Sequence, residues 1–336
     1  MKKHLWAIGF SLFLTVFTTY AALDTFVIQD VIQTNATETD TSMITSRDPV
    51  LSAPETGTAE QSRGSLRRGG KGSAGSPGQN RNSRTSAADT PVTLNDAEEI
   101  GSYRDGNILI TLTEYTSNNT KIYVADVRLS SVEYLKTAFA QDAYGKNITE
   151  KTSVISKEHQ AILAVNGDYY GSREDGYVIR NGIVYRDTAG DAQVLCIYGD
   201  GSFGIIDPAG ISAEELRESG VWQAFSFGPA LIEDGEIAVR TGDEVGKSKA
   251  SNPRTAIGII DDLHYVFVVS DGRTDESEGL SLTELASFMD SLGVQTAYNL
   301  DGGGSSAMVF RGQVINKPTT NGSIRERGVS DIVYIG

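Results

Sequence analysis

A break in composition near residue 98 limits how much of this chain can fold. Between residue 34 and about residue 95 the chain is rich in Thr, Ser, Gly, Asn and charged residues, and large apolar side chains are almost absent. Such a stretch cannot bury enough apolar surface to offset the conformational entropy lost on folding. We therefore predict a disordered linker over residues 31–98 and one folded domain over residues 99–336. With a single cysteine, Cys196, the domain must be stabilised by its core alone.

The first thirty residues have the pattern of a targeting signal. Met1-Lys2-Lys3 precedes an uncharged, mostly apolar run from Leu5 to Leu23. This run suits a membrane span of about 20 residues, and lysines ahead of it favour a cytoplasmic N-terminus. We expect residues 1–30 to be an uncleaved signal-anchor of a single-pass cell-membrane protein whose C-terminal domain is extracytoplasmic. The alternative is secretion after signal cleavage near Thr19-Tyr20-Ala21.

The charge of the chain excludes one class of partner. The net charge is -15, and because residues 1–98 are nearly balanced, the acidity belongs to the domain that folds. Nucleic acids bind basic surfaces, so a nucleic-acid partner is not expected. The three histidines are too few and too scattered for a histidine metal site.

The domain has the pattern of an α+β protein. Alternating and β-branched runs predict strands at Ile108–Tyr115 and Thr120–Val127. Asn181-Gly182 favours a type I′ hairpin turn, and Ser212 with Glu215 favours a capped helix. Val132–Ala140 could be a short helix or irregular. We predict a strand-rich fold of mixed, largely antiparallel sheets with a few helices.

One parallel connection is expected near the C-terminus. Leu263–Ser270 has the continuous apolar pattern of a strand that is buried on both faces. Ser281 and Glu284 then form a capping box for a helix over Leu282–Leu292, and Val294–Leu300 is the next strand. Strand, helix and strand in this order predict one β-α-β crossover.

Two aspartates are the first candidates for chemistry. Asp271 and Asp301 each follow an apolar strand and precede glycine, and strand ends can present side chains on a rigid scaffold. After Asp301, three residues without side chains allow a ligand to approach the backbone N–H groups, which suits an anion such as phosphate. These residues are Gly302, Gly303 and Gly304. A nucleotide P-loop is excluded, because no Gly-Lys-Ser/Thr follows.

Two further candidate segments and two weaker ones follow. Asn166 and Asp168 follow the apolar run Ala161–Val165, where amides, carboxylates and tyrosines could bind a sugar. Arg254 enters an apolar strand, and its planar guanidinium suits phosphate. Phe227–Leu231 and Arg325–Arg327 are most simply turns and solvated charge.

In this order, the candidate segments resemble the phosphodiester glycosidase family. The resemblance covers roughly residues 150–336. The matching segments are Ala164–Tyr170, Phe227–Leu231, Asn252–Gly258, Val269–Arg273, Asn299–Ser306, Asn316–Pro318 and Arg327–Val329.

The resemblance implies a hydrolase that cleaves the bond between the C1 carbon of a sugar and a phosphodiester oxygen. The expected substrates are carbohydrates or glycosyl phosphates of the cell envelope or of exopolysaccharides. Asp301 and Asp271 would be the catalytic pair, as acid and base or as nucleophile. Arg254, Ser305 and the amides of the Gly302, Gly303 and Gly304 segment would hold the phosphate.

The remaining implied roles concern the sugar and a metal ion. Asn166 and Asp168 would bind the sugar or a metal. Clustered carboxylates of Asp168, Asp271 and Asp301 could hold Ca²⁺ or Mg²⁺ through oxygen ligands, although an acid pair without metal fits equally well.

Two other functions are compatible with the sequence. The domain could be a non-catalytic glycan-binding module of the cell envelope. It could also be a serine hydrolase that uses Ser305 or Ser306, although the Gly-x-Ser-x-Gly elbow is absent.

Overall fold

The computed structural model describes residues 5–32, 44, 97–239 and 251–336. The predicted linker over residues 31–98 therefore lies almost wholly outside the described residues. Within residues 97–239, the first strand is β2 (Glu98–Arg104).

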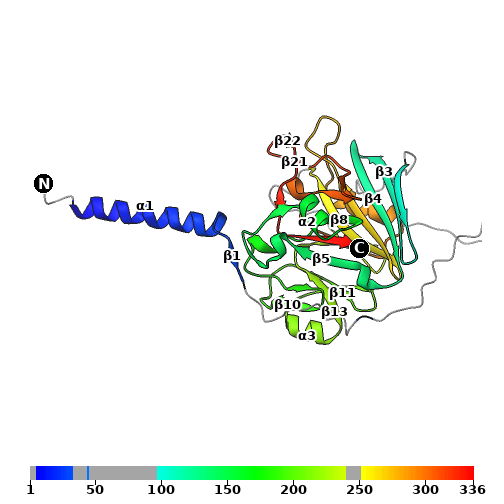
Figure 1. Ribbon diagram of the computed structural model, residues 1–336, viewed down its shortest axis with the longest axis horizontal. Helices are drawn as coiled ribbons and strands as arrows, with labels where there is room; N and C mark the ends of the chain where they lie inside the picture. Colours follow the sequence, from blue (N-terminus) through cyan, green and yellow to red (C-terminus); the bar gives the residue numbers. More distant parts are fainter. Residues whose placement is uncertain (1–4, 33–43, 45–96, 240–250) are drawn as a thin grey trace, which may run out of the picture.

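A helix and a short strand precede the domain. Helix α1 (Leu5–Phe26) extends away from the body, and β1 (Asp30–Val31) pairs antiparallel with β6 (Gly145–Lys146) at the domain surface (Figure 1). In the described ranges, no helix is both long and apolar enough to cross a membrane.

The largest element of the domain is an eight-stranded antiparallel sheet. Its strands, in spatial order, are β15 (Glu236–Ile237), β14 (Ala230–Glu233), β18 (Thr296–Asn299), β16 (Arg254–Asp261), β17 (His264–Ser270), β4 (Thr120–Leu129), β3 (Ile108–Ser117) and β2. Helix α4 (Leu282–Ser291) joins β17 to β18, and both of these strands pair antiparallel with β16 between them. They are therefore parallel to each other, which confirms the predicted β-α-β crossover.

Two five-stranded sheets complete the body. One consists of β20 (Gln313–Val314), β19 (Met308–Phe310), β8 (Leu163–Asn166), β24 (Asp331–Ile335) and β5 (Leu135–Phe139). The other consists of β10 (Ile183–Arg186), β9 (Val178–Arg180), β13 (Val221–Phe225), β11 (Val194–Tyr198) and β12 (Phe203–Ile206). Smaller elements are the ladder of β21 (Thr319–Thr320) with β22 (Ser323–Ile324), the ladder of β23 (Gly328–Val329) with β7 (Glu150–Lys151), and the helices α2 (Thr152–Glu158) and α3 (Ala213–Glu218).

All three sheets contribute to one central core. Ile110 of β3, Val165 of β8 and Trp222 of β13 belong to the same buried cluster. Each sheet also packs against one helix: α4 lies on the eight-stranded sheet, α2 on the sheet of β8, and α3 on the sheet of β13. This arrangement confirms the predicted strand-rich α+β class.

The predictions of one hairpin turn and two helix caps were confirmed. Asn181 and Gly182 both have positive φ, at 51° and 79°, as a type I′ turn requires. Ser212 and Ser281 both form complete capping boxes. The ambiguous segment after Val132 is a single 3-10 turn followed by β5, which pairs with β24.

Candidate active site

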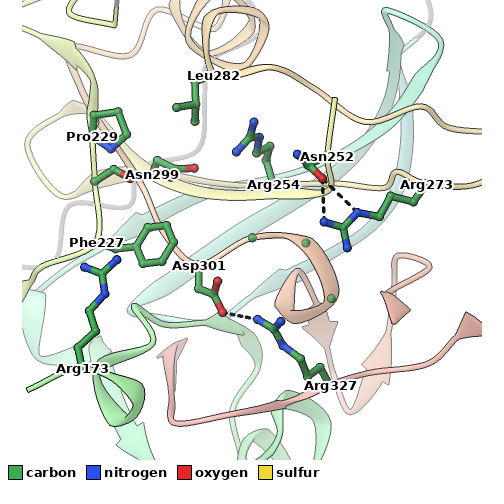
Figure 2. Close-up of a pocket in the computed structure, with 14 residues that line it drawn as sticks. Arg173, Phe227, Pro229, Asn252, Arg254, Arg273, Leu282, Asn299, Asp301 and Arg327 are labelled. Carbon is green, nitrogen blue, oxygen red and sulfur yellow. Dashed lines mark hydrogen bonds and ion pairs between the residues drawn. The ribbon is translucent and has the colours of Figure 1, made fainter. Parts of the chain in front are cut away.

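A cleft of about 410 Å³ lies at the edge of the large sheet where β18 ends and β16 begins (Figure 2). The β13–β14 connection and the segment before β23 form its other walls. Its lining residues are Arg173, Phe227, Gly228, Pro229, Asn252, Arg254, Arg273, Leu282, Asn299, Asp301, Gly302, Gly303, Gly304 and Arg327.

Asp301 is held at the floor of this cleft by its backbone. It follows β18, its N–H donates to the Gly167 carbonyl at 3.2 Å, and its carbonyl accepts from Asn166 Nδ2 at 2.6 Å. Its carboxylate Oδ2 accepts from Arg327 at 2.8 Å (Figure 2). Burial raises the pKa of the Asp301 carboxyl, and the Arg327 cation partly opposes that rise.

Four arginines surround this one carboxylate. Each guanidinium has a separate anchor, so the group is arranged before any ligand arrives. Arg254 donates to the Leu280 carbonyl, Arg273 donates through Nε and Nη2 to Asn252 Oδ1, Arg327 donates to Asp301 and Ser305, and Arg173 lies 5.2 Å from the centre of the Phe227 ring. The cleft is therefore strongly positive in a chain whose net charge is -15.

The three glycines after Asp301 allow close packing rather than an open anion cradle. A Cβ on Gly302 would lie 2.9 Å from the Pro253 carbonyl oxygen, and Gly303 has φ of +63°. The Gly303 N–H already donates to Pro253, and the Gly302 N–H bonds the Asp301 carboxylate. The glycines do line the cleft, but guanidinium groups supply most of its donors for an anion.

Asp271 does not share the cleft with Asp301. Its side chain is 1% exposed, and its carboxylate accepts from the Lys317 N–H, Asn316 Nδ2 and Tyr123 hydroxyl at 2.7, 3.3 and 3.4 Å. The segment that contains Asn316 and Lys317 seals the aspartate inside the domain. The predicted pair of catalytic carboxylates is therefore not found in the cleft, where Asp301 stands without Asp271.

Asn166 and Asp168 support the site from behind. Asn166 is fully buried, and besides holding Asp301 it accepts from the Thr255 hydroxyl at 2.8 Å. Asp168 is also buried and forms an ion pair with Arg180 at 3.0 Å. Neither residue is among the residues that line the cleft, so the prediction that they bind the sugar or a metal there is not supported.

The predicted cluster of three carboxylates does not form. Asp168, Asp271 and Asp301 each have protein partners of their own, as described above. Among the described residues, no group of three or more His, Cys, Asp or Glu side chains is placed to hold a metal ion.

Ser305 and Ser306 lie beneath the cleft rather than on its surface. Both are at most 1% exposed, and Ser305 Oγ accepts from Arg327 Nε at 3.0 Å. His159 and His264 pair with aspartates elsewhere. Ser305 thus orients Arg327, and the geometry gives no support to a serine nucleophile.

Sequence reasoning missed three of the four arginines. Arg273 and Arg327 lie within segments that carried the family resemblance, so their place in those segments was the available signal. Arg327 was instead interpreted as solvated charge. Arg173 had no signal in the sequence. Its guanidinium is placed by stacking on Phe227 and by donation to the Ser226 carbonyl at 3.3 Å.

The sequence is similar to those of known proteins. Residues 159–336 match the model of the phosphodiester glycosidase family. The SPbeta prophage-derived uncharacterized protein YomE of Bacillus subtilis (strain 168) is 28% identical over 198 residues, which are 57% of this chain and 30% of that protein. This chain thus spans less than a third of that curated relative.

Two solved structures share the fold. The catalytic domain of zebrafish N-acetylglucosamine-1-phosphodiester alpha-N-acetylglucosaminidase, auto-inhibited by its pro-peptide, has a TM-score of 0.55 at 20% identity, covering 71% of this chain and 87% of that one. A hypothetical protein from Synechocystis has a TM-score of 0.55 at 15% identity, covering 74% and 64%.

Proposed function

Because this chain belongs to the phosphodiester glycosidase family, which its residues 159–336 match, we propose that it hydrolyses a bond between C1 of a sugar and a phosphodiester oxygen. The proposed substrates are glycosyl phosphates of the cell envelope or of exopolysaccharides. One observation carries the proposal: a carboxylate, Asp301, lies in a cleft among four anchored guanidinium groups.

The arginines suit the phosphate half of such a substrate. Guanidinium groups bind phosphate oxygens through paired, charge-assisted hydrogen bonds. A positive cleft on an otherwise acidic protein also concentrates anions at this one place. When the glycosidic bond breaks, the same cations stabilise the negative charge that develops on the leaving phosphate.

Asp301 suits the sugar half. Since the arginines stabilise the leaving phosphate, protonation of that group is less necessary than in an ordinary glycosidase. Asp301 is then available to act on the anomeric carbon as a nucleophile or on water as a base. The Arg327 cation favours the ionised form that either role needs.

The test uses the full chain and a sugar-1-phosphate methyl diester. Wild-type protein should release free sugar and methyl phosphate. Asp301→Asn should lower kcat by roughly 10²–10⁴-fold, the usual contribution of such a group. Asp290→Asn, which changes an exposed aspartate of α4, is the matched control. Absence of release by wild type would refute the function, and full activity of Asp301→Asn would refute the site.

A non-catalytic glycan-binding module is the second candidate. It is favoured by one observation, that Asp301 is the sole carboxylate on the described lining of the cleft, whereas glycosidases commonly use two. This candidate predicts that the same diester binds, as measured by calorimetry, without release of sugar over a long incubation.

We also propose that the domain works outside the cytoplasm. This rests on the apolar run that follows Lys2 and Lys3. Protease added to intact cells should then degrade the domain, and full protection from that protease would argue against export.

A further inference from the structure

A second and larger hollow adjoins the candidate active site. We call it the outer pocket; its volume is about 980 Å³. The cleft and the outer pocket share Arg173, Phe227, Gly228 and Pro229, so the two form one continuous depression. The outer pocket is at the upper end of the range of roughly 300–1,000 Å³ that is typical of ligand sites.

The walls of the outer pocket are fixed by specific contacts. Arg186 donates to the carbonyls of Gly176 and Arg173, at 2.6 and 2.7 Å, and so holds the loop on one side. On the other side, the Tyr298 hydroxyl donates to the Gln193 carbonyl at 2.5 Å. These contacts fix the positions of both walls.

Tyr298 also joins the outer pocket to the cleft. Its hydroxyl accepts from the Phe227 N–H at 2.9 Å while it donates to Gln193. The boundary between the two hollows is thus tied to the far wall of the outer pocket. A ligand that lies across Phe227 would meet an arranged surface on both sides.

The two hollows differ in charge. The outer pocket is lined by three carboxylates, Glu174, Asp175 and Asp191, in addition to the shared Arg173. Glu174 pairs with Lys146 at 2.9 Å. Carboxylates accept hydrogen bonds from hydroxyl groups and repel a second phosphate. The outer pocket therefore suits a neutral, hydroxyl-rich group, whereas the cleft suits an anion.

We infer that the outer pocket is a substrate subsite that holds neutral sugar units next to the phosphodiester. The preferred substrate is then an oligosaccharide or polysaccharide that carries an isolated phosphodiester, rather than a small sugar phosphate or a chain with closely spaced phosphates. This inference rests on the proposed function, because it assumes that the phosphodiester occupies the cleft.

The experiment compares substrates of different length with the full chain. The short substrate is the sugar-1-phosphate methyl diester, and the long ones carry three further neutral sugars on the alcohol side or on the sugar side. Wild-type kcat/KM should be at least about tenfold higher for one of the long substrates than for the short one, since added contacts in a subsite contribute binding energy.

Two variants test whether the preference for long substrates arises in the outer pocket. Ala192→Trp fills the outer pocket and should remove the difference between long and short substrates. Ala189→Trp changes an exposed alanine of the same loop that does not line the pocket, and the difference should persist. A long substrate with a second phosphate on its extension should have a lower kcat/KM than the long substrate without that phosphate. Asp191→Asn should reduce this difference in kcat/KM.

The outcomes separate the two proposals. If wild type hydrolyses long and short substrates equally well, or if Ala192→Trp keeps the preference, the subsite is refuted while the proposed function stands. If wild type hydrolyses none of them, the proposed function fails, and the subsite fails with it.

Discussion

The ion pair of Asp301 with Arg327 is the chemical centre of the cleft. Burial favours the neutral carboxyl, whereas the adjacent cation favours the carboxylate. The two effects oppose each other, and burial is the larger, so the pKa of Asp301 lies above its ordinary value.

Arg327→Met should move the Asp301 limb of the pH profile of kcat/KM to higher pH. The substitution removes the cation and leaves burial, which raises the pKa further. Arg325→Met, at an exposed position two residues earlier, should leave that limb in place. An unmoved limb in Arg327→Met would show that the ion pair does not control the titrating group.

Asp271→Asn should reduce stability more than catalysis. Asn lacks one of the acceptor oxygens that bind the Lys317 N–H, the Asn316 amide and the Tyr123 hydroxyl. We expect the free energy of unfolding to fall by about 1–3 kcal/mol, with kcat changed only a few-fold. If Asp271→Asn lowered kcat as much as Asp301→Asn does, with stability unchanged, Asp271 would have to take part in catalysis.

Asp301 and Asp271 also show how far local pattern predicts a site. Both follow an apolar strand and precede glycine, so the pattern placed both at a strand end. Only Asp301 lines the cleft, because the distant segment at Asn316 covers Asp271. Arg254 and the glycines, which the sequence predicts to hold the phosphate, line the cleft. Arg173 also lines it, but its position depends on how its loop packs, which no local pattern reveals.

Secondary structure elements were predictable where their ends carry distinctive chemistry. The capping box of α4 and the turn at Asn181-Gly182 are local, so neighbouring residues determine them. Strand β2 was missed because its residues are polar and mostly exposed, with no apolar alternation. The strand forms because it pairs antiparallel with β3.

Ser281→Ala should destabilise the protein through α4. The Ser281 side chain accepts from the Glu284 N–H at 3.2 Å, which is the N-terminal cap of the helix. Loss of such a cap costs about 1 kcal/mol, to be measured as a lower urea midpoint at constant m-value. Asp290→Asn, near the exposed C-terminal end of the same helix, should change stability by less than about 0.5 kcal/mol.

At the scale of the whole molecule, a buried ion cluster of Arg180, Asp168 and Asp331 links stability to pH. Arg180 lies between Asp168 and Asp331, at 3.0 and 2.9 Å, so one cation faces two carboxyls. Burial raises the pKa of Asp331 to about 7; the Arg180 cation opposes the rise, and the neighbouring Asp168 charge adds to it. The folded protein therefore binds a proton at pH values where an unfolded chain would release it.

The contribution of Asp331 to stability should be largest in acid. It is complete below the ordinary carboxyl pKa of about 4 and is lost as pH rises through about 7. Asp331→Asn should flatten the fall in melting temperature between pH 4 and pH 7. A variant curve parallel to that of wild type would assign the proton to another group.

The sheets combine strands from before and after residue 159, and this has a practical consequence. The family match begins at residue 159, yet β4 pairs with β17 and β5 pairs with β24. A truncation at that homology boundary would leave two long strand edges open, and open edges invite aggregation. Expression of the isolated domain should therefore start ahead of β2, at Glu98, and gene shuffling should place its junction there.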